Sequence, residues 1–206
     1  MYMLYATLDY SNVFFINFKC CYSTFENLCR EGFVKKINTN TRYIEDEKFK
    51  NKSDIKLWLV MRDPYSRIVS FYKDKFVNCY NGHFRNPNKQ YDKQPCQKNM
   101  YKYSNESKIR SLEFKLSDLI DAIKRGYNDP HISSQANVLH INQFSGQINV
   151  IRIEDEEFAN KCKEIFGFEL LRHNSSDSEH CLDELTEDDR KFLYNKYKRD
   201  FELYIK

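Results

Sequence analysis

The chain has 206 residues, a formal net charge of +3, and 31% charged residues. A chain of this length can bury a substantial core, and we expect a single domain over 1–206. The small net charge points to no particular partner. The sequence shows no apolar run of transmembrane length, and its beginning has neither the basic nor the continuous apolar segment of a signal peptide.

The seven cysteines form no CxxC pair and no Cys/His cluster at zinc spacing, so we expect no metal site. Their odd number favours reduced thiols in a cytosol-like compartment. A bridge between Cys79 and Cys96 is the alternative for a secreted or lumenal chain.

A strand over 13–18 and a helix beginning near Ser23 are the first predicted elements. The strand is nearly all apolar, as is typical of a strand covered on both faces. Ser23-x-x-Glu26 is a capping-box pattern, and Gly32 is a typical helix stop. A helix N-terminus offers unpaired N–H groups and a partial positive charge, so this junction is typical of an anion site.

A second junction of the same kind joins a strand over 56–61 to a helix with Asp63 at its cap and Pro64 in its first turn. Apolar residues recur at helical spacing as far as Phe76. Two anion sites of this kind predict a ligand with two anionic ends.

Residues 77–110 lose this periodicity and contain seven Lys or Arg among Asn, Gln, Pro and Tyr. A loop this long is usually functional or disordered, so we expect a loop insertion here. Its aromatic and cationic residues suit a glycan-binding lid or an RNA-binding loop, and a solvated loop is the third alternative.

The rest of the chain alternates again between helix and strand. We expect helices over 117–125 and 132–140, a strand over 148–153, a helix over 155–166, and a last helix opened by Thr186 that includes Tyr204. This order predicts an α/β fold, a three-layer sandwich with a central parallel sheet.

Polar residues suited to phosphate or sulfate follow both predicted strands. In the first segment, Phe18-Lys-Cys-Cys-Tyr-Ser-Thr-Phe25, the groups are Lys19, Ser23 and Thr24; in the second they are Arg62 and Ser70. The glycines of a Walker loop are absent, which disfavours an NTPase. In the alternative interpretation, Ser23 is a simple cap, Lys19 is a surface residue, and Arg62 pairs with an acidic side chain.

Together these two segments resemble the cofactor-binding motifs of the sulfotransferase superfamily, in its carbohydrate, family 2 type. Arg62-Asp-Pro-Tyr-Ser-Arg-Ile-Val-Ser-Phe-Tyr-Lys-Asp-Lys-Phe76 matches every fixed position of the second motif. The first match is partial, because Phe18 stands where the family has Pro and Tyr22 varies a small position. Three further segments also resemble the family: Asp129–Gln135, Val150–Glu154 and Arg172–Ser176, as does the C-terminal Leu193–Phe201.

The resemblance implies a P-loop-like sulfotransferase fold and transfer of a sulfuryl group from 3′-phosphoadenylyl sulfate (PAPS) to a hydroxyl of a glycan or related acceptor. It implies that Lys19, Ser23 and Thr24 hold the 5′-phosphosulfate, and that Arg62 and Ser70 hold the 3′-phosphate. Lys19 is also the expected donor to the leaving oxygen. No metal is expected, since Lys19 and the helix N–H groups supply the positive field.

The acceptor hydroxyl needs a general base, and His131 is our candidate because imidazole titrates near neutral pH. A hydrogen-bonded structural histidine is the alternative, and Glu154 and Asp129 are the other candidate bases. We expect Arg152 and Glu154 to form a buried ion pair that supports the cofactor loop.

Two other functions stay open: a catalytically inactive homologue that only binds the nucleotide, and a basic RNA-binding α/β protein, although we expect no nucleic-acid partner. Family members of this type are usually anchored in the Golgi lumen. The sequence contains no anchor, so a soluble, cytoplasmic protein is the default expectation, and the Golgi lumen the alternative if the chain is truncated. The acceptor and the oligomeric state are not specified by the sequence.

Overall fold

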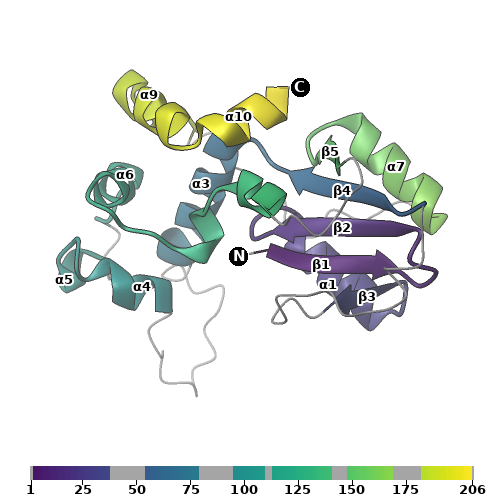
Figure 1. The fold of residues 1–206 in the computed structure, drawn as a ribbon. Helices are drawn as coiled ribbons and strands as arrows, with labels where there is room; N and C mark the ends of the chain where they lie inside the picture. Colours follow the sequence, from purple (N-terminus) through teal and green to yellow (C-terminus); the bar gives the residue numbers. More distant parts are fainter. Residues whose placement is uncertain are drawn as a thin grey trace, which may run out of the picture. The chain divides into compact units, whose positions relative to one another are not determined.

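The computed structural model describes residues 2–37, 54–78, 95–109, 113–140, 148–168 and 182–205 (Figure 1). The chain divides into two compact units, which are described separately. Unit 1 contains Met1–Asp63, Ser134–Ser175 and Tyr197–Lys206, and unit 2 contains Pro64–Ser133 and Ser176–Lys196.

Unit 1 is built on a five-stranded sheet with the strand order β3-β1-β2-β4-β5. β2 pairs in parallel with β4, and β4 in parallel with β5, whereas β1 is antiparallel to both β2 and β3. The predicted parallel sheet is therefore confirmed as the centre of a mixed sheet. The strands are β1 (Tyr2–Thr7), β2 (Asn12–Asn17), β3 (Val34–Ile37), β4 (Lys56–Met61) and β5 (Ile148–Arg152).

Alternate side chains of these strands enter two apolar clusters, one on each face of the sheet. On one face Phe14, Ile16 and Val60 pack with residues of α1 (Tyr22–Arg30) and α7 (Glu156–Phe166). On the other face the strand residues pack with Leu203 and Tyr204 of α10 (Lys198–Ile205). Helices therefore cover both faces, and the predicted three-layer α/β architecture is confirmed.

The helices of unit 2 are α3 (Pro64–Tyr72), α4 (Pro95–Met100), α5 (Glu106–Ile109), α6 (Leu116–Lys124) and α9 (Glu187–Lys196). Phe71, Tyr72, Phe76 and Phe114 form a continuous set of ring contacts inside this unit. High aromatic content thus supplies much of its apolar interior.

Four segments differ from their predicted form. The helix predicted over 132–140 is instead two short 3-10 helices, η2 (Pro130–Ile132) and η3 (Gln135–His140). The helix that starts at Pro64 becomes a π-helix over Lys73–Val77. The predicted last helix is two helices, α9 and α10, because Tyr197 interrupts it and Asp200 donates its N–H to the Tyr197 carbonyl. Within the segment predicted as a loop, α4 and α5 are helical, and Met100 and Ile109 are fully buried.

Other predictions fall outside the described residues, among them Cys79 and its bridge to Cys96, and the family-like stretch over 172–176. Where the chain is described, Cys20, Cys21, Cys29 and Cys162 are thiols and form no disulfide. In the same residues, the helices are all too short or too polar to cross a bilayer.

The core of unit 1 yields a stability prediction. Phe14 is 2% exposed and its ring lies 5.1 Å from that of Phe25. Replacing Phe14 with Ala should lower the free energy of unfolding by about 3–5 kcal/mol, since it leaves a cavity between sheet and helix. Phe33, 41% exposed, is the control, and Phe33→Ala should cost less than about 1 kcal/mol in the same urea titration. Equal losses for the two variants would contradict this packing.

Candidate functional site

The carboxyl ends of the three parallel strands lie at one edge of the sheet, and each is followed by a polar residue of unit 1. Lys19 follows β2, Arg62 follows β4, and Glu154 follows β5. Because β4 is the hydrogen-bonded neighbour of both β2 and β5, these three chain segments are adjacent. This edge is where open α/β sheets hold their ligands.

The loop after β2 has an unusual backbone for its residue types. Lys19 has φ 67° and Cys21 has φ 57°, and among the described non-glycine residues only Tyr10 shares a positive φ. Left-handed conformations are strained in non-glycine residues and concentrate at functional sites. Between Lys19 and Cys21, the Cys20 N–H donates to the Asn17 carbonyl at 3.1 Å, which ties the loop back to the end of β2. The strained backbone therefore supports a functional role for the loop at Lys19.

The N-terminus of α1 leaves its first N–H groups directed at this loop. Cys21 is the N-cap and makes no side-chain capping hydrogen bond, and the first helical bond runs from the Phe25 N–H to the Cys21 carbonyl. The first turn contains no acidic residue. It does contain Ser23 and Thr24, so both predicted hydroxyls lie where an anion would meet the helix dipole.

The predicted capping box at Ser23 and Glu26 is wrong. The helix begins one residue earlier than Ser23, and the Glu26 carboxylate turns to the sheet instead. There it accepts a hydrogen bond from the Tyr5 hydroxyl at 2.5 Å and forms an ion pair with Lys36. These partners, on β1 and β3, hold the pKa of Glu26 below its usual value although burial opposes them. Glu26 thus anchors α1 to the sheet.

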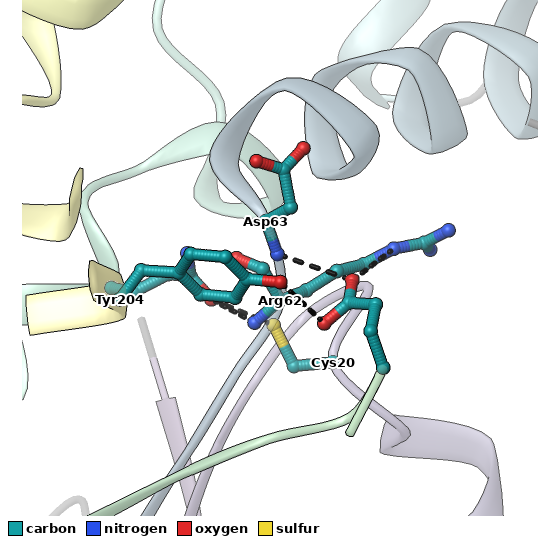
Figure 2. Close-up of polar contacts among 6 residues, drawn as sticks. Cys20, Arg62, Asp63 and Tyr204 are labelled. Carbon is teal, nitrogen blue, oxygen red and sulfur yellow. Dashed lines mark hydrogen bonds and ion pairs between the residues drawn. The ribbon is translucent and has the colours of Figure 1, made fainter. Parts of the chain in front are cut away.

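Arg62 lies in a polar cluster with Asp63 and Tyr204, all three labelled in Figure 2. Its Nε is 3.8 Å from Glu154 Oε1, which also accepts a hydrogen bond from the Asp63 N–H at 3.2 Å. The other carboxylate oxygen accepts from the Tyr204 hydroxyl at 3.2 Å. Burial raises the pKa of Glu154, against the opposing effects of the Asp63 N–H and the Arg62 charge. Burial and the nearby Glu154 carboxylate also raise the pKa of Tyr204.

The expected ion pair between Arg152 and Glu154 is wrong, and Arg62 is the partner of Glu154. Arg152 instead has its Nε 3.7 Å from Asp155 Oδ2, and its guanidinium lies over the Tyr204 ring at 5.2 Å. Glu154 still supports the segment after β4, because its carboxylate contacts Arg62 and accepts the Asp63 N–H.

Gln135 joins the segments that follow β2 and β4, and sequence reasoning assigned it no role. Its Oε1 accepts hydrogen bonds from the Arg62 N–H at 2.9 Å and from Cys20 Sγ at 3.0 Å. Its Nε2 donates to the Arg62 carbonyl at 2.8 Å. The side chain is fully buried. Its only sequence signal was its position at the end of the family-like segment that begins at Asp129.

Asp200 fixes the backbone around Gln135. Its carboxylate accepts from the N–H groups of Gln135 at 2.8 Å and Ala136 at 2.9 Å, and from the Ser134 hydroxyl at 2.6 Å. Asp200 is itself fully buried, so three short hydrogen bonds compensate for the loss of its hydration.

The remaining predicted site residues, Ser70 and His131, belong to unit 2. Ser70 lies on α3 and is 7% exposed. His131 Nδ1 is 2.5 Å from Asp129 Oδ1, and its ring stacks on Phe71 with 5.6 Å between centroids. The structure thus brings Lys19, Ser23, Thr24 and Arg62 to one sheet edge, and places Ser70 and His131 in the other unit.

Asp129 orients the histidine. It is 5% exposed and also accepts the His131 N–H at 2.8 Å. Burial raises its pKa, but the hydrogen bonds from His131 and the charge of Lys75 outweigh burial and lower it below the usual value. An ionised Asp129 keeps the proton of neutral His131 on Nδ1 and the lone pair on Nε2. That tautomer suits a general base.

Comparisons with known proteins bear on this arrangement. A family model described as the sulfotransferase family matches residues 1–145, which include the loop after β2, Arg62, Ser70, His131 and Gln135. Curated proteins and solved structures gave no match. Across the described residues, His, Cys, Asp and Glu side chains form no group of three that could hold a metal ion.

The lowered pKa of Asp129 yields a pH prediction. A carboxyl whose folded pKa is depressed stabilises the fold above its unfolded pKa, about 3.9, and this contribution is lost as the pH falls through the folded pKa. Asp129→Asn should therefore be less stable than wild type by about 1–2 kcal/mol near pH 5, with a smaller difference near pH 2.5. Urea unfolding at both pH values measures the difference, and a gap independent of pH would contradict the assignment.

Proposed function

Because the chain belongs to the sulfotransferase family, we propose that it transfers a sulfuryl group from PAPS to a hydroxyl of a glycan or related acceptor. The observation that supports this most strongly is the sheet edge of unit 1. There the strained loop at Lys19, the uncapped first turn of α1 and the Arg62 segment follow adjacent parallel strands. Two cationic side chains on neighbouring segments suit a nucleotide with an anionic group at each end.

The 5′-phosphosulfate end is proposed to bind at the loop after β2. The N–H groups of the first turn of α1 would hold its oxygens, and the hydroxyls of Ser23 and Thr24 would add hydrogen bonds. The absence of an acidic residue from this first turn favours the ligand's negative charge. Phe18, where the family has Pro, packs against Tyr22 at 5.2 Å between ring centroids, so an aromatic contact holds the loop here.

The 3′-phosphate is proposed to bind Arg62, with Ser70 adding a hydroxyl. Arg62 forms its ion pair with Glu154 through Nε. A guanidinium has five N–H donors, so a carboxylate at Nε is compatible with a phosphate at the Nη groups. Glu154 would then orient the guanidinium rather than compete with the ligand.

The transfer step needs charge compensation at the leaving group. The acceptor oxygen forms a bond to sulfur while the bond between sulfur and the bridging phosphate oxygen breaks, which releases adenosine 3′,5′-bisphosphate. Negative charge develops on the bridging oxygen, and Lys19 is the proposed donor to it. Positioning of the donor and acceptor oxygens in line supplies much of the remaining rate enhancement.

His131 is the proposed general base, which takes the proton of the acceptor hydroxyl on Nε2. Its support is the contact with Asp129, because a carboxylate on Nδ1 orients the ring and stabilises the imidazolium that forms. Lys19 and the helix N–H groups provide the positive field, so the proposal includes no metal.

Lys19→Ala should abolish or severely slow transfer, by about 10²–10³-fold or more, because the developing charge loses its donor. Binding of adenosine 3′,5′-bisphosphate should be weakened but retained. The measurement is formation of sulfated product from PAPS and a panel of glycan acceptors, with Lys35→Ala on β3 as the matched control. A wild-type protein that binds the bisphosphate but forms no product with any acceptor would identify a nucleotide-binding homologue without transferase activity.

Arg62→Ala should remove the preference for the 3′-phosphate. Wild type should bind adenosine 3′,5′-bisphosphate about 10–100-fold more tightly than AMP, as expected for hydrogen bonds to a charged group. The variant should bind both nucleotides with nearly equal affinity in calorimetric titrations. Arg152→Ala, at the end of the neighbouring strand, should keep the preference. Strong discrimination by the Arg62→Ala protein would show that another group holds the 3′-phosphate.

His131→Gln should lower kcat by about 10²–10⁴-fold without changing the affinity for adenosine 3′,5′-bisphosphate, since the base contacts the acceptor and not the nucleotide. Glu154→Gln is the comparison, because Glu154 is the alternative base. A large loss of kcat in Glu154→Gln, with kcat largely retained in His131→Gln, would reverse the assignment.

A further inference from the structure

We propose that Gln135 is a positioning residue that couples the two ends of the nucleotide site, so that an anion bound at the Lys19 loop raises the affinity of Arg62 for the second anion. This inference rests on the proposed function, since it assigns cooperation between the two phosphate-binding segments. It concerns a residue that touches neither phosphate and acts through the backbone of both segments.

The hydrogen bonds of the Gln135 amide connect the two segments directly. Oε1 accepts both from Cys20, which lies between the two strained residues of the loop, and from the Arg62 N–H. Nε2 donates to the carbonyl of the same Arg62. Because the amide group is planar, moving the Cys20 loop relative to Arg62 changes the geometry of at least one of these bonds. The amide thus acts as a rigid link.

The base of this link is fixed to the rest of unit 1. The Gln135 N–H donates to Asp200 Oδ2 at 2.8 Å, and the Gln135 carbonyl accepts from Asn17 Nδ2 at 3.4 Å. Asn17 is the last residue of β2, so the link is attached to the strand that leads into the Lys19 loop. Gln135 is fully buried and can exchange none of these bonds for water.

Coupling follows from the strain in the loop. Lys19 and Cys21 hold left-handed conformations that are costly for non-glycine residues. An anion held beside Lys19 by the first turn of α1 favours this strained conformation, and Cys20 transmits that preference through Gln135 to the backbone of Arg62. A second anion then binds to a segment that is already ordered, which is positive cooperativity.

A purely structural role for Gln135 makes a different prediction. If the role is purely structural, replacing Gln135 should lower the stability of the fold and reduce the affinity for every ligand by a common factor. Coupling instead predicts that the two phosphates contribute non-additively to binding affinity. The non-additivity is a ratio of association constants. Its numerator is the product for adenosine and adenosine 3′,5′-bisphosphate, and its denominator is the product for 5′-AMP and 3′-AMP.

The experiment measures these four affinities by calorimetry, with competition titrations for the weak ligands, in three proteins. Wild type and Asn149→Leu should show the same non-additivity. Gln135→Met should show a value lower by about 5–20-fold, within the usual range of coupling between sites. Asn149 is the control because its Nδ2, like Gln135 Nε2, donates to a backbone carbonyl, but that of Leu57, near the beginning of β4 and away from Arg62.

A second measurement uses the wild-type protein alone, so it does not depend on the variant folding. Addition of 5′-AMP, which carries no 3′-phosphate, should slow hydrogen exchange of the Arg62 N–H, because that N–H donates to Gln135 Oε1. Unchanged exchange at saturating 5′-AMP would overturn the coupling. Non-additivity that Gln135→Met retains in full would overturn it equally.

The two failures are distinguishable. If wild type does not prefer the 3′-phosphorylated nucleotide, the proposed function fails at Arg62, and the coupling fails with it. If wild type shows the preference and Gln135→Met loses affinity for all four ligands by one common factor, the proposed function stands and Gln135 is structural only.

Discussion

Parallel pairing of β2, β4 and β5 is the constraint on which the candidate site depends. Since the three strands run in the same direction, the residues that follow them meet at one edge of the sheet. The apolar runs that form these strands fix which residues emerge there: Lys19, Arg62 and Glu154. Helices on both faces bury the strands, so the edge is held by the core of unit 1 rather than by the loops alone.

The carboxylates near this edge lie away from the turn that is proposed to bind an anion. The loop and the first turn of α1 contain no carboxylate, whereas Arg62 has Glu154 at its Nε. The carboxylate of Glu26, on the same helix as the anion-binding turn, is directed to Tyr5 and Lys36 on the sheet. Acidic groups thus orient the helix and the arginine, and leave the N–H groups of the turn to a ligand.

Periodicity predicted much of the fold. Apolar runs identified β2 and β4, and a strand followed by a helix was also predicted where β5 and α7 lie. β1 and β3 were not predicted. β3 has only four residues, too few for a periodic signal, and it pairs with β1 at the edge of the sheet. The division of the last helix was also missed, since neither proline nor glycine marks the break at Tyr197.

For the candidate site, local sequence patterns predicted the cationic residues but not the hydrogen-bond and ion-pair partners that position the site. Lys19 and Arg62 lie next to strand ends, which sequence can locate. The partners of Gln135 are 73 and 115 residues away along the chain, so no local rule predicts them. The same limit explains both errors at acidic residues: Glu26 and Glu154 each pair with a residue from another strand or strand end rather than with the neighbour that a local pattern suggests.

The most direct test of the account is a crystal structure of the protein with adenosine 3′,5′-bisphosphate bound. The 5′-phosphate should lie beside Lys19 on the N–H groups of the first turn of α1, and the 3′-phosphate should contact the Arg62 guanidinium, while Glu154 remains at Nε. A nucleotide bound elsewhere, or bound at this edge with its 3′-phosphate remote from Arg62, would contradict the account.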